Sequence, residues 1–83
     1  VEFYATACSH CKKLVGALNK LSEEKGDDVF FGKCNIDQEA LLQSRFDISA
    51  VPTLLFIKNG EIKNRLVGEV HPLIIQEEIK KLA

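Results

Sequence analysis

The stretch that decides the fold is Cys8-Ser9-His10-Cys11, a pair of cysteines separated by two residues. The apolar and aromatic run Val1-Glu2-Phe3-Tyr4-Ala5 precedes it and has strand character, whereas Lys12-Lys13-Leu14-Val15 opens an amphipathic helix. Cysteines at this spacing either close a small disulfide ring or supply two of a zinc ion's four ligands. A thiol at a helix N-terminus faces unpaired backbone N–H groups and the positive end of the helix dipole. Both stabilise a thiolate and lower the pKa of such a thiol below the free value of about 8.5. The position therefore favours a redox pair.

The composition predicts one small globular domain over residues 1–83. Apolar residues make up 46% of the chain and charged residues 28%, which is typical of a folded domain. A net charge of −1 gives no reason to expect nucleic acid or an anionic membrane as a partner. Three cysteines are too few for a disulfide scaffold, and no stretch approaches the roughly 20 apolar residues of a membrane span.

No signal peptide is visible, so we expect a cytoplasmic protein. The chain contains no Met and opens inside a predicted strand, so a leading segment preceding Val1 would leave an extracytoplasmic location open.

The hydrophobic pattern predicts seven elements in the order β-α-β-α-β-β-α. A strand, a helix and a second strand in succession form a parallel pair with a right-handed crossover. Asn59-Gly60 is a strong hairpin signal, Gly26 is a plausible C-cap, and Asp37 is a plausible N-cap. The fold class is therefore an α/β sandwich with a mixed four-stranded sheet. Its predicted strands cover residues 1–5, 29–36, 53–57 and 62–67, and its predicted helices cover 9–24, 37–46 and a stretch that begins at Pro72.

Each predicted helix has an apolar side that we expect to face the core. On the first helix this side directs Cys11 inward, whereas Cys8 at the very start points toward solvent, so the two sulfurs differ in access. The expected core-facing residues are Cys11, Leu14, Val15, Leu18 and Leu21 in the first helix, Leu41, Leu42 and Phe46 in the second, and Leu73, Ile74, Ile75, Ile79 and Leu82 in the third.

Four other side chains allow two interpretations each. Glu2 is either a chain-end residue that reaches water or a buried carboxyl with a raised pKa that exchanges protons. Lys33 is either solvated or close to Glu2 across the parallel pair. Cys34 is a buried small hydrophobe or a regulatory thiol, and we favour the first. His71 is a surface or capping residue rather than a metal ligand.

Taken together, these motifs resemble the thioredoxin family over essentially the whole chain. The resemblance rests on Val1-Glu2-Phe3-Tyr4-Ala5 before Cys8-Ser9-His10-Cys11-Lys12, then Asn35-Ile36-Asp37, Val51-Pro52-Thr53, Asn59-Gly60 and Val67-Gly68. It implies a thioredoxin fold. Full-length thioredoxins carry an extra strand and helix before this point, and the resemblance implies that both are absent here.

The resemblance also implies roles for the motif residues. Cys8 is the exposed nucleophile and Cys11 the buried resolving thiol. Glu2 matches the position of a buried acid that accepts a proton, and Lys33 matches the lysine near it. His10 is similar to the histidine of protein disulfide isomerase, where a nearby imidazolium stabilises the thiolate and makes the couple a stronger oxidant.

A substrate groove is implied as well, formed by Ala7, Val51, Pro52 and Gly68. The Val51–Pro52 bond is expected to be cis, and the Val51 backbone is expected to pair with an extended substrate segment. Ala7 stands where thioredoxins usually have Trp, which removes a flat apolar wall from the groove. Gly16 replaces the helix-kinking proline of the family.

We therefore predict a thiol–disulfide oxidoreductase that reduces protein disulfides, acts as a monomer and needs no cofactor. Its partners are disulfide-containing proteins and a separate thioredoxin reductase-like or glutathione system. The alternatives are a disulfide isomerase or oxidase of an oxidising compartment, and a non-catalytic binding module. No metal site is expected, because Cys8, His10 and Cys11 are too close together for a three-ligand zinc set and no second pair completes four ligands.

Overall fold

A computed structural model describes residues 1–82, and Ala83, the last residue of the predicted domain, lies outside the described residues. The seven predicted elements are present in the predicted order, and a short 3₁₀ helix over Gly26–Asp28 follows the first α-helix. Their bounds are β1 (Glu2–Tyr4), α1 (Ser9–Lys25), β2 (Lys33–Asn35), α2 (Ala40–Arg45), β3 (Thr53–Lys58), β4 (Glu61–Val67) and α3 (Pro72–Leu82).

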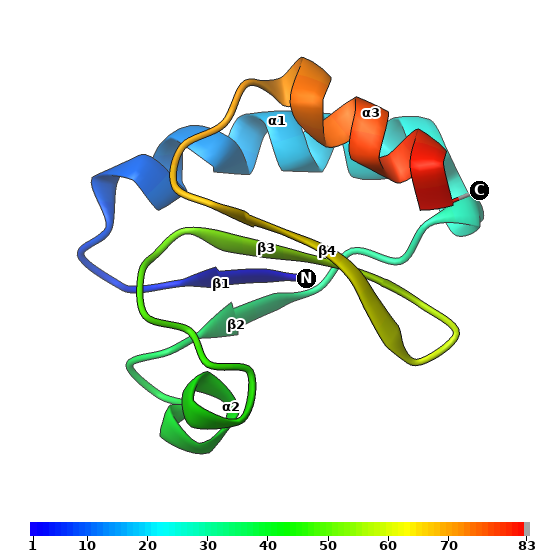
Figure 1. Ribbon diagram of the computed structural model, residues 1–83. Helices are drawn as coiled ribbons and strands as arrows, with labels where there is room; N and C mark the ends of the chain where they lie inside the picture. Colours follow the sequence, from blue (N-terminus) through cyan, green and yellow to red (C-terminus); the bar gives the residue numbers. More distant parts are fainter. Residues whose placement is uncertain (83) are drawn as a thin grey trace.

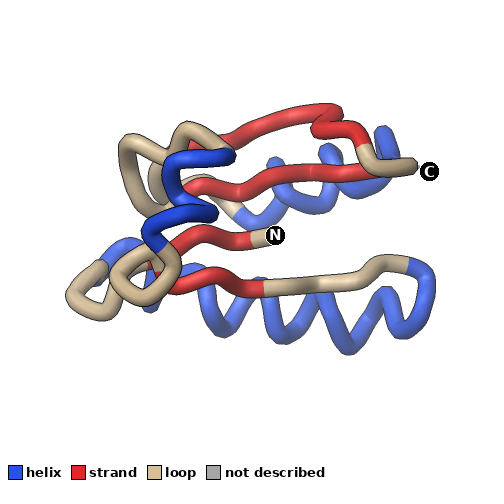
Figure 2. Tube along the Cα trace, turned by 90° about the horizontal axis from the view of Figure 1, so that it is seen from below, coloured by secondary structure: helices blue, strands red, loops and turns tan. Residues whose placement is uncertain are grey.

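The four strands form one mixed sheet in the order β2-β1-β3-β4. β1 runs parallel to β2 and antiparallel to β3, and β3 pairs antiparallel with β4. Helices α1 and α3 cover one face of this sheet and α2 lies on the other, as Figures 1 and 2 show from two directions. The predicted fold class is confirmed.

The core consists of two apolar clusters, one on each face of the sheet. Because side chains alternate along a strand, neighbouring residues of β3 contribute to different clusters. Their buried members are Leu14, Leu21, Leu54, Phe56, Ile75 and Ile79 under α1 and α3, and Phe3, Cys34, Ile48 and Leu55 on the α2 side. Burial of these side chains on both faces anchors β1 and α1, the two elements that flank the cysteine motif.

Three predicted elements are shorter in the structure. β1 covers Glu2–Tyr4 rather than residues 1–5. β2 covers three residues rather than 29–36, because β1 bonds only to the segment between Gly32 and Ile36 and leaves 29–31 without a ladder partner. α2 begins at Ala40 rather than next to Asp37, and its N-cap is Glu39, which makes no side-chain capping bond. The prediction of Asp37 as the N-cap is therefore wrong.

Several residues expected in the core are exposed. Leu41 is 86% exposed and Leu42 is 36% exposed, because α2 is a six-residue helix that contacts the sheet mainly through its end, where Phe46 packs on Phe3. In α3, Ile75 is 1% exposed, whereas the preceding Leu73 and Ile74 are 61% and 46% exposed. Each step along a helix turns a side chain by about 100°, so the buried stripe through Ile75 and Ile79 excludes both. Val15 in α1 is likewise 38% exposed.

The predicted turn signals are confirmed. Gly26 follows α1 with a φ of +58°, and its N–H donates to the Ser22 carbonyl as a C-cap. Asn59 and Gly60 both have positive φ values, 55° and 77°, and connect β3 to β4.

Both edges of the sheet are open within residues 1–82, because β2 and β4 each have a strand partner on one side only. Phe30, just before β2, is 94% exposed. No helix in the same range is both long enough and apolar enough to cross a membrane.

The neighbouring isoleucines of α3 provide a test of the packing. We expect Ile75→Ala to lower the free energy of unfolding by about 2–5 kcal/mol, because it leaves a cavity in the cluster beneath α1 and α3. Ile74→Ala is the matched control and should cost less than about 1 kcal/mol. Urea unfolding monitored by circular dichroism measures both values. Equal losses in the two variants would contradict this assignment of the buried stripe.

Candidate active site

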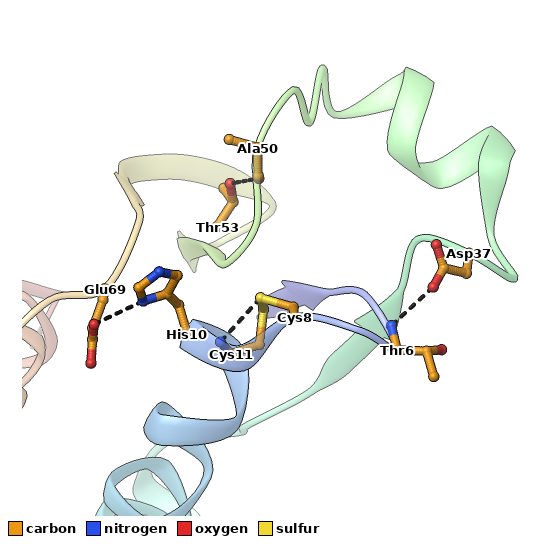
Figure 3. Close-up of a disulfide and its surroundings, with 8 residues drawn as sticks. All are labelled: Thr6, Cys8, His10, Cys11, Asp37, Ala50, Thr53 and Glu69. Atoms are coloured by element: carbon orange, nitrogen blue, oxygen red, sulfur yellow. Dashed lines mark hydrogen bonds and ion pairs between the residues drawn. A yellow bond between two sulfur atoms is a disulfide. The ribbon is translucent and has the colours of Figure 1, made fainter.

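The site begins with Cys8, which is the N-cap residue of α1. Its backbone is extended, with φ −83° and ψ 106°, and its Sγ accepts a hydrogen bond of 3.1 Å from the Cys11 N–H. This N–H is one of those that a helix start leaves without an intrahelical partner. The two sulfurs are joined in a disulfide, which Figure 3 shows at the start of α1.

The two cysteines differ in access, as predicted. Cys8 is half-buried, and the intervening Ser9 and His10 are exposed, whereas Cys11 is only 3% exposed. An attacking group from outside can therefore reach Cys8 more easily than Cys11.

The loop before the motif is held by β2 and the segment after it. The Thr6 N–H donates to Asp37 Oδ2 at 2.9 Å, and Asn35 Nδ2 donates to Thr6 Oγ1 at 3.1 Å. The Asp37 N–H in turn donates to Asn35 Oδ1 at 3.0 Å. Asp37 thus holds the loop that precedes Cys8 in the chain instead of capping α2. Sequence reasoning missed this role, although Asn35-Ile36-Asp37 stood out as a motif.

Sheet register brings three loops to the same end of the molecule as the disulfide. Phe3 pairs with Thr53, and Thr53 pairs with Val67. The segment that follows β1, the segment that precedes β3 and the segment that follows β4 therefore all leave the sheet at this end. They contain Ala7, the Val51–Pro52 pair and Gly68.

These loops are tied to one another by backbone hydrogen bonds. The Val51–Pro52 peptide bond is cis, as predicted, and Pro52 is buried. The Pro52 carbonyl accepts a 2.8 Å bond from the Gly68 N–H, and Gly68 has a φ of +91°. Thr53 Oγ1 donates to the Ala50 carbonyl at 2.7 Å (Figure 3). Val51 is half-buried and Ala7 is exposed.

His10 has a partner that sequence reasoning did not identify. Its Nδ1 lies 2.9 Å from Oε2 of Glu69, the residue after Gly68, and Lys13 Nζ lies 3.9 Å from Glu69 Oε1. Figure 3 shows the His10 ring directed toward Glu69. His10 and Glu69 are 59 residues apart, so the pair becomes visible only in the folded chain.

Glu2 is buried, which excludes its interpretation as a chain-end residue that reaches water. It is 3% exposed, and its Oε2 has no hydrogen-bond partner among the described residues. Burial raises the pKa of the Glu2 carboxyl above its ordinary value of 4.5, and the positive charges of Lys33 and of the Val1 amino group oppose that rise. Lys33 is exposed and is the register partner of Glu2 across β1 and β2, but no ion pair joins them within residues 1–82.

Cys34 lies in the core, and His71 lies at the start of α3. Cys34 is 9% exposed in the cluster on the α2 side, and burial raises the pKa of its thiol. Both properties favour the interpretation as a small core residue. His71 accepts a 3.1 Å bond from the Leu73 N–H at the start of α3, so it caps that helix. In the described part of the chain, no three His, Cys, Asp or Glu side chains are grouped in a way that would hold a metal ion.

A cysteine pair closed as a disulfide at a helix start, with a cis-proline turn at the same end of a mixed sheet, defines the class of α/β protein to which this chain belongs. The chain belongs to the thioredoxin family, whose model, described as "Thioredoxin", matches residues 1–81.

Curated relatives agree with this assignment. The chain is 31% identical over 81 residues to the chloroplastic thioredoxin M-type of Spinacia oleracea, and the match covers 98% of this chain and 45% of the relative. It is 35% identical to the mitochondrial thioredoxin of Mus musculus, with 99% and 49% of the two chains covered. The chain thus spans about half the length of these relatives. As a thioredoxin homologue with a Cys-X-X-Cys disulfide, it is consistent with a thiol–disulfide oxidoreductase.

Solved structures show the same fold. Oxidised mitochondrial thioredoxin 3 of Saccharomyces cerevisiae superimposes with a TM-score of 0.89 at 32% identity, covering 98% of this chain and 74% of that one. A second structure, with a TM-score of 0.90 at 31% identity and the same coverage, concerns thiol resolution in a yeast mitochondrial 1-Cys peroxiredoxin via glutathione/thioredoxin systems.

The buried carboxyl predicts a pH dependence of stability. Folded Glu2 keeps its proton to a higher pH than unfolded Glu2, so its contribution to the free energy of unfolding falls as the pH rises from about 4.5 through the folded pKa. Glu2→Gln removes this loss, so the stability of the variant relative to the wild type should increase as the pH rises above about 4.5, in measurements made from about pH 4 to pH 8. Urea unfolding across this range measures the difference, with the exposed Glu23→Gln as control. A difference that does not change with pH would refute the assignment.

Proposed function

We propose that this chain is a thiol–disulfide oxidoreductase that reduces disulfides in protein substrates. The observation that carries the proposal is the position of Cys8 as N-cap of α1, with its sulfur 3.1 Å from the Cys11 N–H and with Cys11 buried beside it. In the reduced protein the same N–H and the helix dipole favour a thiolate on Cys8. Family membership supports the same chemistry.

The reaction takes place in two thiol–disulfide exchanges. The Cys8 thiolate attacks one sulfur of the substrate disulfide, a mixed disulfide forms, and the other substrate sulfur leaves as a thiolate that takes up a proton. Cys11 then loses its proton and attacks Cys8 Sγ, which releases the second substrate sulfur. The substrate gains two electrons and two protons, and the protein is left with the Cys8–Cys11 disulfide found in the structure.

Glu2 is our candidate for the group that accepts the Cys11 proton. It is a buried carboxyl whose Oε2 has no partner among residues 1–82, and burial raises its pKa toward the range in which a carboxyl exchanges protons near neutral pH. Lys33, opposite Glu2 in the register, favours its charged form and so limits that rise.

The substrate is proposed to bind along the turn formed by Val51 and Pro52. An extended segment would add to the Val51 backbone as an extra strand, beside Ala7 and Gly68. The Gly68 N–H already donates to the Pro52 carbonyl, so Gly68 offers a substrate its own carbonyl rather than its N–H. Ala7 is small and exposed, so it would form only a low wall beside the bound segment.

The disulfide must be reduced again before a second turnover. We propose a separate thioredoxin reductase-like enzyme or the glutathione system as the electron source, since a solved neighbour is described in terms of glutathione/thioredoxin systems and a peroxiredoxin. The cycle requires no bound cofactor, because both electrons reside in the sulfur pair.

The second candidate function is that of a disulfide oxidase or isomerase, and His10 is the residue that favours it. An imidazolium near Cys8 stabilises the reduced form and raises the reduction potential. A potential of roughly −270 mV is typical of a reductant and roughly −180 mV of an isomerase. Equilibration in graded glutathione buffers, followed by alkylation and mass analysis, measures this potential directly. The third candidate is a binding module without catalysis. We do not favour it, because a binding module would not need both Cys8 and Cys11.

Trapping experiments test the two cysteine roles. We expect Cys11→Ser to accumulate a mixed disulfide with a disulfide-containing protein, because the first exchange proceeds and the second is blocked. Cys8→Ser should form little of this adduct, since the exposed nucleophile is missing. Cys34→Ser is the control and should reduce the substrate at the wild-type rate. Adducts that form equally well in Cys8→Ser would contradict the assignment of the nucleophile.

The role of Glu2 is tested by separating the two exchanges. Glu2→Gln should slow the resolution of the mixed disulfide by about tenfold or more, because the proton acceptor is lost, and should leave its formation nearly unchanged. Stopped-flow measurements resolve the two steps, and the exposed Glu61→Gln serves as the charge-matched control. Equal slowing of both steps would eliminate Glu2 as the acceptor.

A further inference from the structure

The carboxylate of Glu69 is the unexpected feature of this site. Its Oε2 lies 2.9 Å from His10 Nδ1, and its Oε1 lies 3.9 Å from Lys13 Nζ. His10 belongs to the first turn of α1, between the two cysteines, whereas Glu69 lies in the loop between β4 and α3. In Figure 3 the His10 ring points toward Glu69, while the two sulfurs lie on the other side of His10.

Both ends of this contact are held in place by the backbone. The Gly68 N–H donates to the Pro52 carbonyl at 2.8 Å, which fixes the loop just before Glu69. The start of α1 is fixed by the bond between Cys8 Sγ and the Cys11 N–H. Glu69 is therefore presented to His10 by the same turn that borders the proposed substrate groove.

This arrangement changes what His10 does to the sulfur pair. A free imidazolium beside Cys8 stabilises the thiolate and hence the reduced protein. When a carboxylate already pairs with the ring, the thiolate must compete with that carboxylate for the same positive charge. The Glu69 charge also repels a developing thiolate. Both effects favour the oxidised protein relative to the reduced one.

We propose that Glu69 is a positioning residue that holds the His10 imidazole away from Cys8 and so keeps the couple more reducing than His10 alone would make it. This inference rests on the proposed function, because it assumes a Cys8–Cys11 couple that exchanges with other thiols. It explains how a chain with a histidine similar to that of protein disulfide isomerase can serve as a reductant.

The equilibrium that reports the effect is balanced in sulfur, electrons and protons. The Cys8–Cys11 disulfide and two molecules of glutathione give the protein dithiol and one molecule of glutathione disulfide. Glutathione supplies both electrons and both protons. The constant for this reaction is measured in graded glutathione buffers at fixed pH and ionic strength.

The test is a double-mutant cycle of the wild type, Glu69→Gln, His10→Ala and the double variant. Glu69→Gln should shift the equilibrium toward the dithiol by about threefold, a size expected of a pair whose side chains are 60% and 41% exposed. For a two-electron couple this is about 14 mV toward a more oxidising potential, at 29.6 mV per tenfold. In the His10→Ala background the same substitution should give a clearly smaller shift, because only the direct repulsion between the Glu69 charge and the thiolate is left to remove.

Two controls sharpen the cycle. Glu61→Gln removes a carboxylate that also pairs with a lysine, Lys63, but at the tip of the β3–β4 hairpin, and it should not move the potential. Raising the ionic strength to about 1 M should shrink the shift caused by Glu69→Gln, because salt screens an exposed pair.

The proposal is overturned if Glu69→Gln makes the couple more reducing, or if its shift persists in full when His10 is alanine. The first result would mean that Glu69 promotes the influence of His10 on Cys8, and the second that it acts without His10. A failure of the proposed function would give a different experimental result. In that case the wild type itself forms no Cys8–Cys11 couple in the buffers or does not reduce a protein disulfide.

Discussion

The hydrogen bond from the Cys11 N–H to Cys8 Sγ is the interaction around which the site is built. It makes Cys8 both the last extended residue after β1 and the cap of α1. β1 is anchored through buried Phe3 and α1 through buried Leu14, so the core fixes the point where strand and helix meet. Cys8 Sγ is thus positioned by packing, and it contacts a backbone group that every helix start leaves available.

Sheet register supplies the remainder of the site. Because Phe3, Thr53 and Val67 lie in one row across three strands, loops distant in sequence converge at the disulfide end. The bond between Gly68 and Pro52 then joins two of these loops, and the bonds of Asp37 and Asn35 with Thr6 hold the third. A shift of register by one residue would move the side chains of β3 from one core cluster to the other and would displace these loops. Core packing and site geometry therefore depend on the same pairing.

Local sequence signals were enough to predict the order of the elements, the mixed sheet, the hairpin at Asn59-Gly60 and the differing access of Cys8 and Cys11. They failed where distant packing decides. Leu41 fits a helical stripe but lies on a helix too short to bury it, and Asp37 bonds to Thr6, 31 residues away, instead of capping its own helix. The partner of His10 is Glu69, which follows the C-terminal end of β4, and no local pattern reveals this pairing. Burial of Glu2 depended in the same way on the position of β1 inside the sheet.

Within the described residues, the outer side of β2 combines an open strand edge, an exposed aromatic ring and a charged side chain. A strand whose outer N–H and C=O groups lack partners among residues 1–82 is a template onto which a second strand can add. Phe30, which precedes β2 and is 94% exposed, adds an apolar surface beside this edge. Lys33, exposed on that strand, places a charge there that disfavours such addition.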